Sequence, residues 1–523
     1  MAISAGSVSP LFKIGGSLGA LTATSFATAP AFGDYKAIVV INLDGGNDAM
    51  NTFPPTGEKA HAEYKDIRRN LGVEKTDLSL SEHYTHDDKG HYLPEAGDKQ
   101  PYWLEDGVAL GSGGNTEGQY IVGSYHLKDK EGKQTGLGIH AFMPELAKLY
   151  DNGKLSVVSN VGTLIEPATK AQIKAKEVKI PPFLFSHLHQ YRAVSSLESR
   201  LSGKTGWAGR LADRWSVEGA LGLNISFTGG NSLFKGVETK GLQLSGKGVD
   251  KYTGGANTHE LLNDIEEIEE TNPLRRVYNK RMSDAARLSD AINSVWDTAP
   301  DFSTFSAKNS YGNALFDKGG DLEAFRTEFG MRTHHGLDGK MFSGLKDTAK
   351  MIKLSKSMGY NRQIFNVSES GYDFHGNQLE THSKKLRALS LGVSDLYKAL
   401  EEMGMEEEVL IVLSSEFGRT LKSNEDGTDH GWGGHSFMLC GDPSFNGGEV
   451  FGTVMTDLKL DGENAHTNRA RIIPTTAIEQ MLAPTLKWFG VENGTMEYVL
   501  PNLKNFKTKD EDVESSFLQN VFS

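Results

Sequence analysis

The chain has 523 residues, of which 38% are hydrophobic and 24% are charged, as is usual for a globular protein. Its formal net charge is -13 at pH 7, so it offers no basic field and nucleic acid is not expected as its main partner. A single cysteine, Cys440, excludes an internal disulfide framework and a cysteine-based zinc site.

The N-terminal segment resembles an export signal. Residues 14–33 form an uncharged, mildly apolar stretch of small residues after Lys13, and Ala-Thr-Ala at 27–29 and Ala-Pro-Ala at 29–31 resemble cleavage sites. We therefore expect an export signal or a flexible N-terminus over residues 1–33, and a periplasmic or extracellular protein. Elsewhere no stretch approaches the roughly 18 apolar residues of a membrane span, so we predict no integral membrane span.

Buried strands alternate with amphipathic helices along the rest of the chain. Continuous apolar runs predict strands at 37–43, 155–161, 363–370 and within 407–420. Residues 382–403 place leucines on one helical face and end at Gly404. This alternation predicts an α/β fold: a doubly wound, mainly parallel central sheet with helices on both faces.

We predict one domain over residues 34–505. Two polar segments, about 80–135 and 230–330, do not fit the strand–helix alternation and are interpreted as insertions. Residues 506–523 are predicted to be a solvated, frayed C-terminal tail because they include a run of charged residues.

Acidic and histidine side chains gather just after the predicted strands. In open α/β sheets, ligands bind at this carboxyl edge, so these side chains are expected to meet there. Mixed nitrogen and oxygen ligands favour zinc or manganese over calcium. The candidates are Asp44 and Asp48 after the first strand, Asp373, His375 and His382 after the third, Glu416 and Arg419 after the fourth, and Asp429, His430 and His435 in the loop that follows.

Two further groups of residues have both a functional and a structural interpretation. Ser186 and His187 open a predicted helix, where the free N–H groups could hold an anionic substrate, although a serine N-cap is an equally physical interpretation. His83, His86 and His91 could hold a metal ion, but a solvated loop is the favoured interpretation.

Several motifs together resemble a known family. They are VVINLDGGNDAMNT, the SH of FLFSHLHQ, TGWAGRLADR, GYDFHGNQ, SEFGRT, GTDHGWGGH and RIIPTTAIEQMLAPTLKWFG. In this order they resemble the bacterial proteins called domain of unknown function 1501, from about Lys36 to Asn502. That family is similar to the alkaline phosphatase and sulfatase superfamily, which implies a doubly wound sheet with a two-metal site at its carboxyl edge.

The resemblance implies roles for particular residues. Asp44, or alternatively Asp48, matches the metal aspartate after the first strand. The implied roles of the others are metal binding for Asp373, His375, Asp429 and His430, with His435 close by, and the nucleophile or its neighbour for Ser186. In a hydrolase, Ser186 would then be the nucleophile and Arg419 a clamp on substrate oxygens. Glu416 and Phe417 stand where phosphatases and sulfatases typically have Asp-His, so one metal ligand is missing or is supplied from elsewhere.

Two functions are consistent with these sequence features. The first is an exported metal-dependent hydrolase of phosphate or sulfate esters, with a divalent ion (Zn, Mn, Mg or Ca) and a small anionic ester or polysaccharide-type substrate. The alternative is a non-catalytic envelope or extracellular protein that retains the fold and one structural ion.

Overall fold

A computed structural model describes residues 32–78, 123–198, 203–215, 222–229, 232–244, 272, 275–276, 279, 292–296, 298–321, 324, 337 and 339–523. The predicted export signal lies almost entirely outside the described residues, as do His83, His86 and His91. Much of each predicted insertion also lies outside them.

A mixed sheet of nine strands forms the centre of the protein, in the order β12-β4-β11-β8-β1-β7-β5-β6, with β13 paired to β4. Only β11 runs antiparallel to its neighbours among these described strands, so the sheet is mainly parallel. The strands are β1 (Lys36–Leu43), β4 (Leu155–Gly162), β5 (Asn224–Ser226), β6 (Leu242–Gln243), β7 (Arg362–Glu369), β8 (Val409–Ser414), β11 (Gly434–Cys440), β12 (Val450–Gly452) and β13 (Thr476–Ala477).

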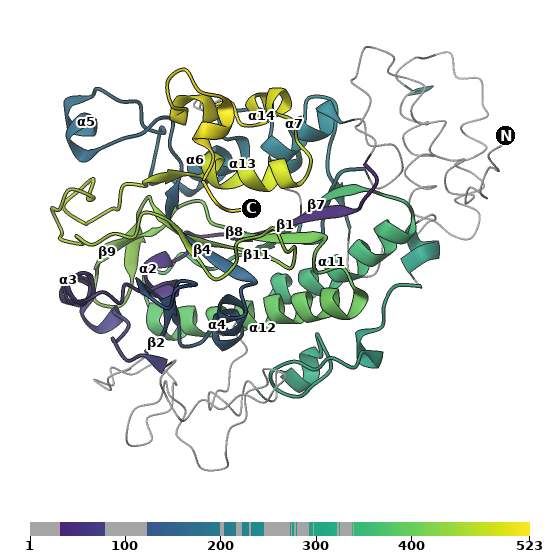
Figure 1. Cartoon of the computed structure of the whole chain (residues 1–523), viewed down its shortest axis with the longest axis horizontal. Helices are drawn as coiled ribbons and strands as arrows, with labels where there is room; N and C mark the ends of the chain where they lie inside the picture. The colour runs from purple at the N-terminus through teal and green to yellow at the C-terminus, as the bar shows by residue number, and fades with distance from the viewer. Residues whose placement is uncertain are drawn as a thin grey trace.

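Helices cover both faces of this sheet (Figure 1). On one face lie α4 (Pro144–Asp151), α11 (Lys340–Ser357) and α12 (Gln378–Met403), and on the other lie α6 (His187–Ser196), α7 (Trp207–Arg214), α13 (Ile478–Trp488) and α14 (Asn493–Val499). Each face of the sheet has its own apolar core. Strand β1 contributes side chains to both cores, because successive side chains of a strand point to opposite faces. Val39 and Ile41 pack with Leu386 of α12, whereas Ile38 and Val40 pack in the core that contains Leu211 of α7. The predicted α/β class is confirmed.

The remaining elements lie around this body. They are α2 (Ala49–Thr52), α3 (Glu58–Arg68), α5 (Lys170–Ala175), the hairpin of β2 (Ser124–Lys128) and β3 (Gln134–His140), and the hairpin of β9 (Arg419–Ser423) and β10 (Thr428–His430). Among the helices in the described part of the chain, none has the length and apolar character needed to cross a membrane.

The C-terminal segment corrects one expectation. Residues 506–523 are packed against the domain rather than frayed, with Val513 and Val521 buried in the same core as α13. The Phe522 ring stacks on Trp488, with 6.0 Å between ring centroids. In the sequence these apolar residues stand among charged ones, so they form no recognisable apolar run. Their burial offsets the conformational entropy lost when the chain end becomes ordered.

Candidate metal centre

Three histidines and one aspartate converge at the carboxyl edge of the sheet. His187 is the first residue of α6, Asp373 and His375 lie in the loop after β7, and His430 ends β10. The Nε2 atom of His430 lies 3.0 Å from Nε2 of His187 and 3.0 Å from Nε2 of His375. Asp373 Oδ1 lies 3.2 Å from the same His430 atom, so the other three ligand atoms all lie close to His430 Nε2. Ligand atoms of His187, Asp373 and His430 all lie within 4.8 Å of one another, and His375 adjoins this closer group through His430.

The other ring nitrogen of each histidine faces a hydrogen-bond acceptor. Nδ1 of His187 lies 2.8 Å from Glu416 Oε1, and Nδ1 of His430 lies 2.8 Å from the carbonyl oxygen of Phe185. A carbonyl or carboxylate oxygen only accepts, so each Nδ1 carries the proton and each neutral ring turns a lone pair outward at Nε2. Two such lone pairs face one another at 3.0 Å, which is unfavourable unless a proton or a cation lies between them.

This arrangement fits a divalent metal ion. Metal-binding histidines usually donate their second N–H to a carboxylate or a backbone carbonyl, which fixes the ring orientation. His375 makes a looser contact of this kind, since its Nδ1 lies 3.5 Å from Asp429 Oδ1, an ion-pair distance. Three imidazole nitrogens and one carboxylate suit zinc or manganese better than calcium.

Buried or partly buried charges hold the cluster in place. Arg419 is 1% exposed and donates from Nη1 to Asp373 Oδ1 at 2.8 Å. Burial raises the pKa of Asp373, but the hydrogen bond and charge of Arg419 outweigh it and lower that pKa. The hydrogen bond that His187 donates to Glu416 raises the pKa of His187, whereas burial lowers the pKa of His430.

Arg419 is committed to the protein rather than free for a substrate. Besides Asp373 it donates to the carbonyl oxygen of Gly45 at 3.0 Å, and to the hydroxyl and carbonyl oxygens of Thr428. The geometry therefore gives Arg419 a positioning role toward Asp373, in place of the substrate clamp expected of it in a hydrolase.

Asp44 lies beside this cluster on a tight glycine turn. Burial, followed by the charges of Glu416 and Glu369, raises the pKa of Asp44 to about 7. Gly45 has a φ of 123° and donates its N–H to Glu416 Oε1 at 2.9 Å. A Cβ atom on Gly45 would lie 2.4 Å from the backbone nitrogen of Asp373, so the turn packs directly against the loop that carries the cluster.

We expect Gly45→Ala to lower the free energy of unfolding by about 3 kcal/mol, because it combines backbone strain with a clash against the Asp373 loop. Gly229→Ala is the matched control, since Gly229 has a φ of 116° but its added Cβ would meet no atom closer than 4.0 Å. Urea unfolding of both variants measures the difference. If both variants lost the same free energy of unfolding, the close contact between Gly45 and the Asp373 loop would contribute nothing to stability.

Two predicted metal residues lie away from the cluster. Asp48 is fully buried, and both of its carboxylate oxygens accept hydrogen bonds from Arg68. His435 accepts a hydrogen bond at Nδ1 from the backbone N–H of Asn160, so its Nε2 carries the proton, and burial lowers its pKa to about 4. His382, the remaining histidine candidate, is buried with its Nε2 3.0 Å from Asn47 Oδ1. None of these three contributes an atom to the convergence.

Ser186 is the N-cap residue of α6 and lies immediately before His187. Its Oγ lies 2.8 Å from Nδ1 of His189 and makes no capping hydrogen bond to the helix. The neighbouring Phe185 carbonyl accepts from His430, so Ser186 stands between two residues that contact His430, with a histidine positioned to take its proton.

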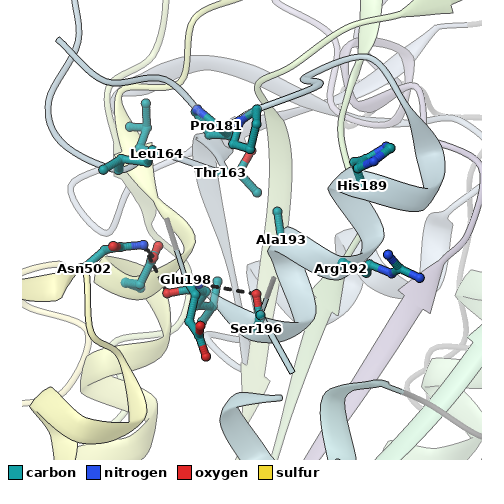
Figure 2. Close-up of a pocket in the computed structure, with 14 residues that line it drawn as sticks. Thr163, Leu164, Pro181, His189, Arg192, Ala193, Ser196, Glu198 and Asn502 are labelled. Carbon is teal, nitrogen blue, oxygen red and sulfur yellow. Dashed lines mark hydrogen bonds between the residues drawn. The ribbon is translucent and has the colours of Figure 1, made fainter. Parts of the chain in front are cut away.

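A separate hollow lies on the other side of α6 (Figure 2). It is open to solvent and is lined by His189, Ala193 and Ser196 of the helix. Residues two apart on a helix point in nearly opposite directions, so His187 and His189 serve different faces of α6. Glu479 lines this hollow with 1% exposure; its Oε1 accepts from Asn502 at 3.0 Å and its Oε2 has no partner among the described residues.

We expect Glu479→Gln to gain stability relative to the wild type as pH rises. Burial raises the pKa of Glu479 from 4.5 to about 7. The stability associated with its neutral form is therefore fully present below pH 4.5 and is lost as pH rises through about 7. Between pH 5 and pH 8.5 the variant should gain about 2 to 3 kcal/mol, as measured by urea unfolding. A constant difference between the two proteins would contradict the burial argument.

The sequence was compared with known proteins. Residues 35–472 match the family described as "Protein of unknown function (DUF1501)". The chain belongs to the DUF1501 family. No curated protein matches the sequence. The family resemblance carried by the motifs is thus confirmed, and its two histidine-bearing motifs after β7 and β9 supply Asp373, His375 and His430 to the centre.

Two solved structures show distant similarity to this chain. The crystal structure of Ps i-CgsB is 10% identical and aligns over 70% of this chain and 72% of that chain, with a TM-score of 0.28. A mutant of the alkaline phosphatase PafA is 12% identical over 94% of this chain and 84% of that chain, with a TM-score of 0.21. Neither likeness is close enough to support a function, which is argued below from the site alone.

Proposed function

We propose that the protein is a metal-dependent hydrolase of phosphate or sulfate esters, exported to the periplasm or beyond. The observation that carries the proposal is the convergence of three histidine Nε2 atoms and Asp373 at the carboxyl edge of the sheet, each Nδ1 facing an acceptor. A bound divalent ion would polarise the ester and stabilise charge that develops on the transferred group.

The protein's own residues supply the remaining parts. His187, Asp373, His375 and His430 would hold the ion, while Glu416, Asp429 and Arg419 orient those ligands. Ser186 is the candidate nucleophile, because His189 lies within hydrogen-bond reach of its hydroxyl. Asp44, with its pKa near 7, is a candidate ligand for a second ion or a candidate acid–base group next to Glu416.

The test is turnover of p-nitrophenyl phosphate and p-nitrophenyl sulfate by protein prepared without chelator and supplied with zinc or manganese. We expect hydrolysis of at least one ester, its loss in His430→Ala, and a loss in Ser186→Ala if serine rather than water attacks. Metal binding without turnover of any anionic ester, including sulfated oligosaccharides, would instead favour the non-catalytic envelope protein with a structural ion.

A further inference from the structure

Arg471 lies beside the candidate metal centre and has no carboxylate partner among the residues that the structure describes. Its Nε donates to the carbonyl oxygen of His430 at 2.7 Å, and its Nη1 to the hydroxyl of Thr467 at 3.3 Å. Its guanidinium carbon lies 4.0 Å from the centroid of the Phe185 ring. All three partners are uncharged, and the side chain is half-buried.

The charge that acts on Arg471 is the positive charge of another arginine, Arg469. Burial and then the positive charge of Arg469 lower the pKa of Arg471, although an arginine stays protonated under all ordinary conditions. Arg469 itself is paired with Asp429. A partly desolvated cation with a second cation nearby is costly unless an anion is bound.

The buried arginines in the described part of the chain are compensated. Each of them pairs with a carboxylate: Arg68 with Asp48, Arg210 with Glu198, Arg362 with Asp34, Arg387 with Glu145, and Arg419 with Asp373. Arg471 is half-buried, and unlike these five buried arginines it takes part in none of the ion pairs between described residues.

The contacts of Arg471 place its guanidinium next to residues of the candidate metal centre. It holds the backbone of His430 and stacks on Phe185, the residue whose carbonyl accepts from His430 Nδ1. We propose that Arg471, supported by the charge of Arg469, binds the anionic oxygens of the substrate. The planar guanidinium suits the paired oxygens of a phosphate or sulfate group. This inference rests on the proposed function and moves the substrate clamp from Arg419 to Arg471.

Binding of inorganic phosphate and of inorganic sulfate to the metal-loaded protein, measured by titration calorimetry, tests the inference without turnover. We expect the wild type to bind at least one of these anions and Arg471→Gln to bind it at least about tenfold more weakly. Arg471→Lys keeps the charge but loses the planar fork, so its affinity should fall between the two. Arg192→Gln, which removes an exposed arginine of α6, is the control and should bind like the wild type.

Melting temperatures of the variants show whether they are folded, and Arg471→Lys decides the question if Arg471→Gln is not. Unchanged anion affinity in the folded Arg471 variants, or no anion binding by the wild type, would overturn the inference. Anion binding that depends on Arg471 in a protein that turns over no ester would support the inference while the hydrolase proposal fails. Ester turnover together with an anion affinity that does not depend on Arg471 would overturn the inference and leave the hydrolase proposal standing.

Discussion

We expect His430→Ala to weaken divalent metal binding by at least about a hundredfold. Nε2 of His430 is the atom shared by the whole cluster, since it lies 3.0 Å from the Nε2 atoms of His187 and His375 and 3.2 Å from Asp373 Oδ1. Four-ligand zinc sites bind with about 10–16 kcal/mol, so one ligand accounts for roughly 3 kcal/mol, which corresponds to about a hundredfold in affinity.

Metal content per chain by plasma mass spectrometry, with affinity measured by competition against a chelating dye, checks this result. His126→Ala is the control, because His126 is a half-buried histidine of β2 whose partner is Asp77. Asp429→Ala should have a smaller effect, about 10- to 100-fold, because Asp429 orients His375. Wild-type affinity in His430→Ala would mean that the three histidines are held by hydrogen bonds to one another and to Asp373.

The central strands were predictable because their sequences are continuous and apolar. The predicted strand at 37–43 is β1, at 155–161 it is β4, and at 363–370 it is β7, each within one residue at its ends. A strand buried on both faces needs no polar alternation, so its run of β-branched residues stands out. By contrast, the three-residue β5 and two-residue β6 contain too few residues for any periodicity to show.

Part of the site was predictable for a related reason. Asp373, His375 and His430 lie just after strands or in the hairpin that follows them, and parallel strands bring their carboxyl ends to one edge. His187 was associated only with the start of a helix. Its contact with Glu416 spans 229 positions, so only the fold brings the two together. The pair Ser-His at a helix start was the signal available.

Other predicted residues lie outside the cluster, because burial and contact partners cannot be read from a motif. Asp44 and Asp48 are four residues apart, yet one lies beside Glu416 and the other is fully buried. Arg419 follows β8 as a substrate clamp would, but its donors are used by Asp373 and Thr428. The position of a residue after a strand predicts that it lies at the carboxyl edge of the sheet. Its role there depends on which charged side chain the fold places next to it.

We expect Asp48→Asn to lower the free energy of unfolding by about 3–5 kcal/mol while leaving metal content unchanged. Asp48 and Arg68 are both fully buried, and Nη2 of Arg68 donates to Asp48 Oδ1 at 2.8 Å. Burial raises the pKa of Asp48, but the charge and hydrogen bonds of Arg68 outweigh it and lower that pKa. Removing one partner of a buried ion pair leaves the other charge uncompensated, which is the costly step.

Asp66→Asn is the control for this experiment, because Asp66 is an exposed aspartate of the same helix as Arg68 and its loss should change stability by no more than about 0.5 kcal/mol. Urea unfolding and metal analysis of the two variants together separate the roles of the neighbouring aspartates. A metal ligand at position 48 would show the reverse result: Asp48→Asn would lose the ion, and its stability would match the wild type once both proteins were stripped of metal. The buried pair with Arg68 predicts that the stability difference persists in the metal-free proteins, since the uncompensated guanidinium remains whether or not an ion is bound.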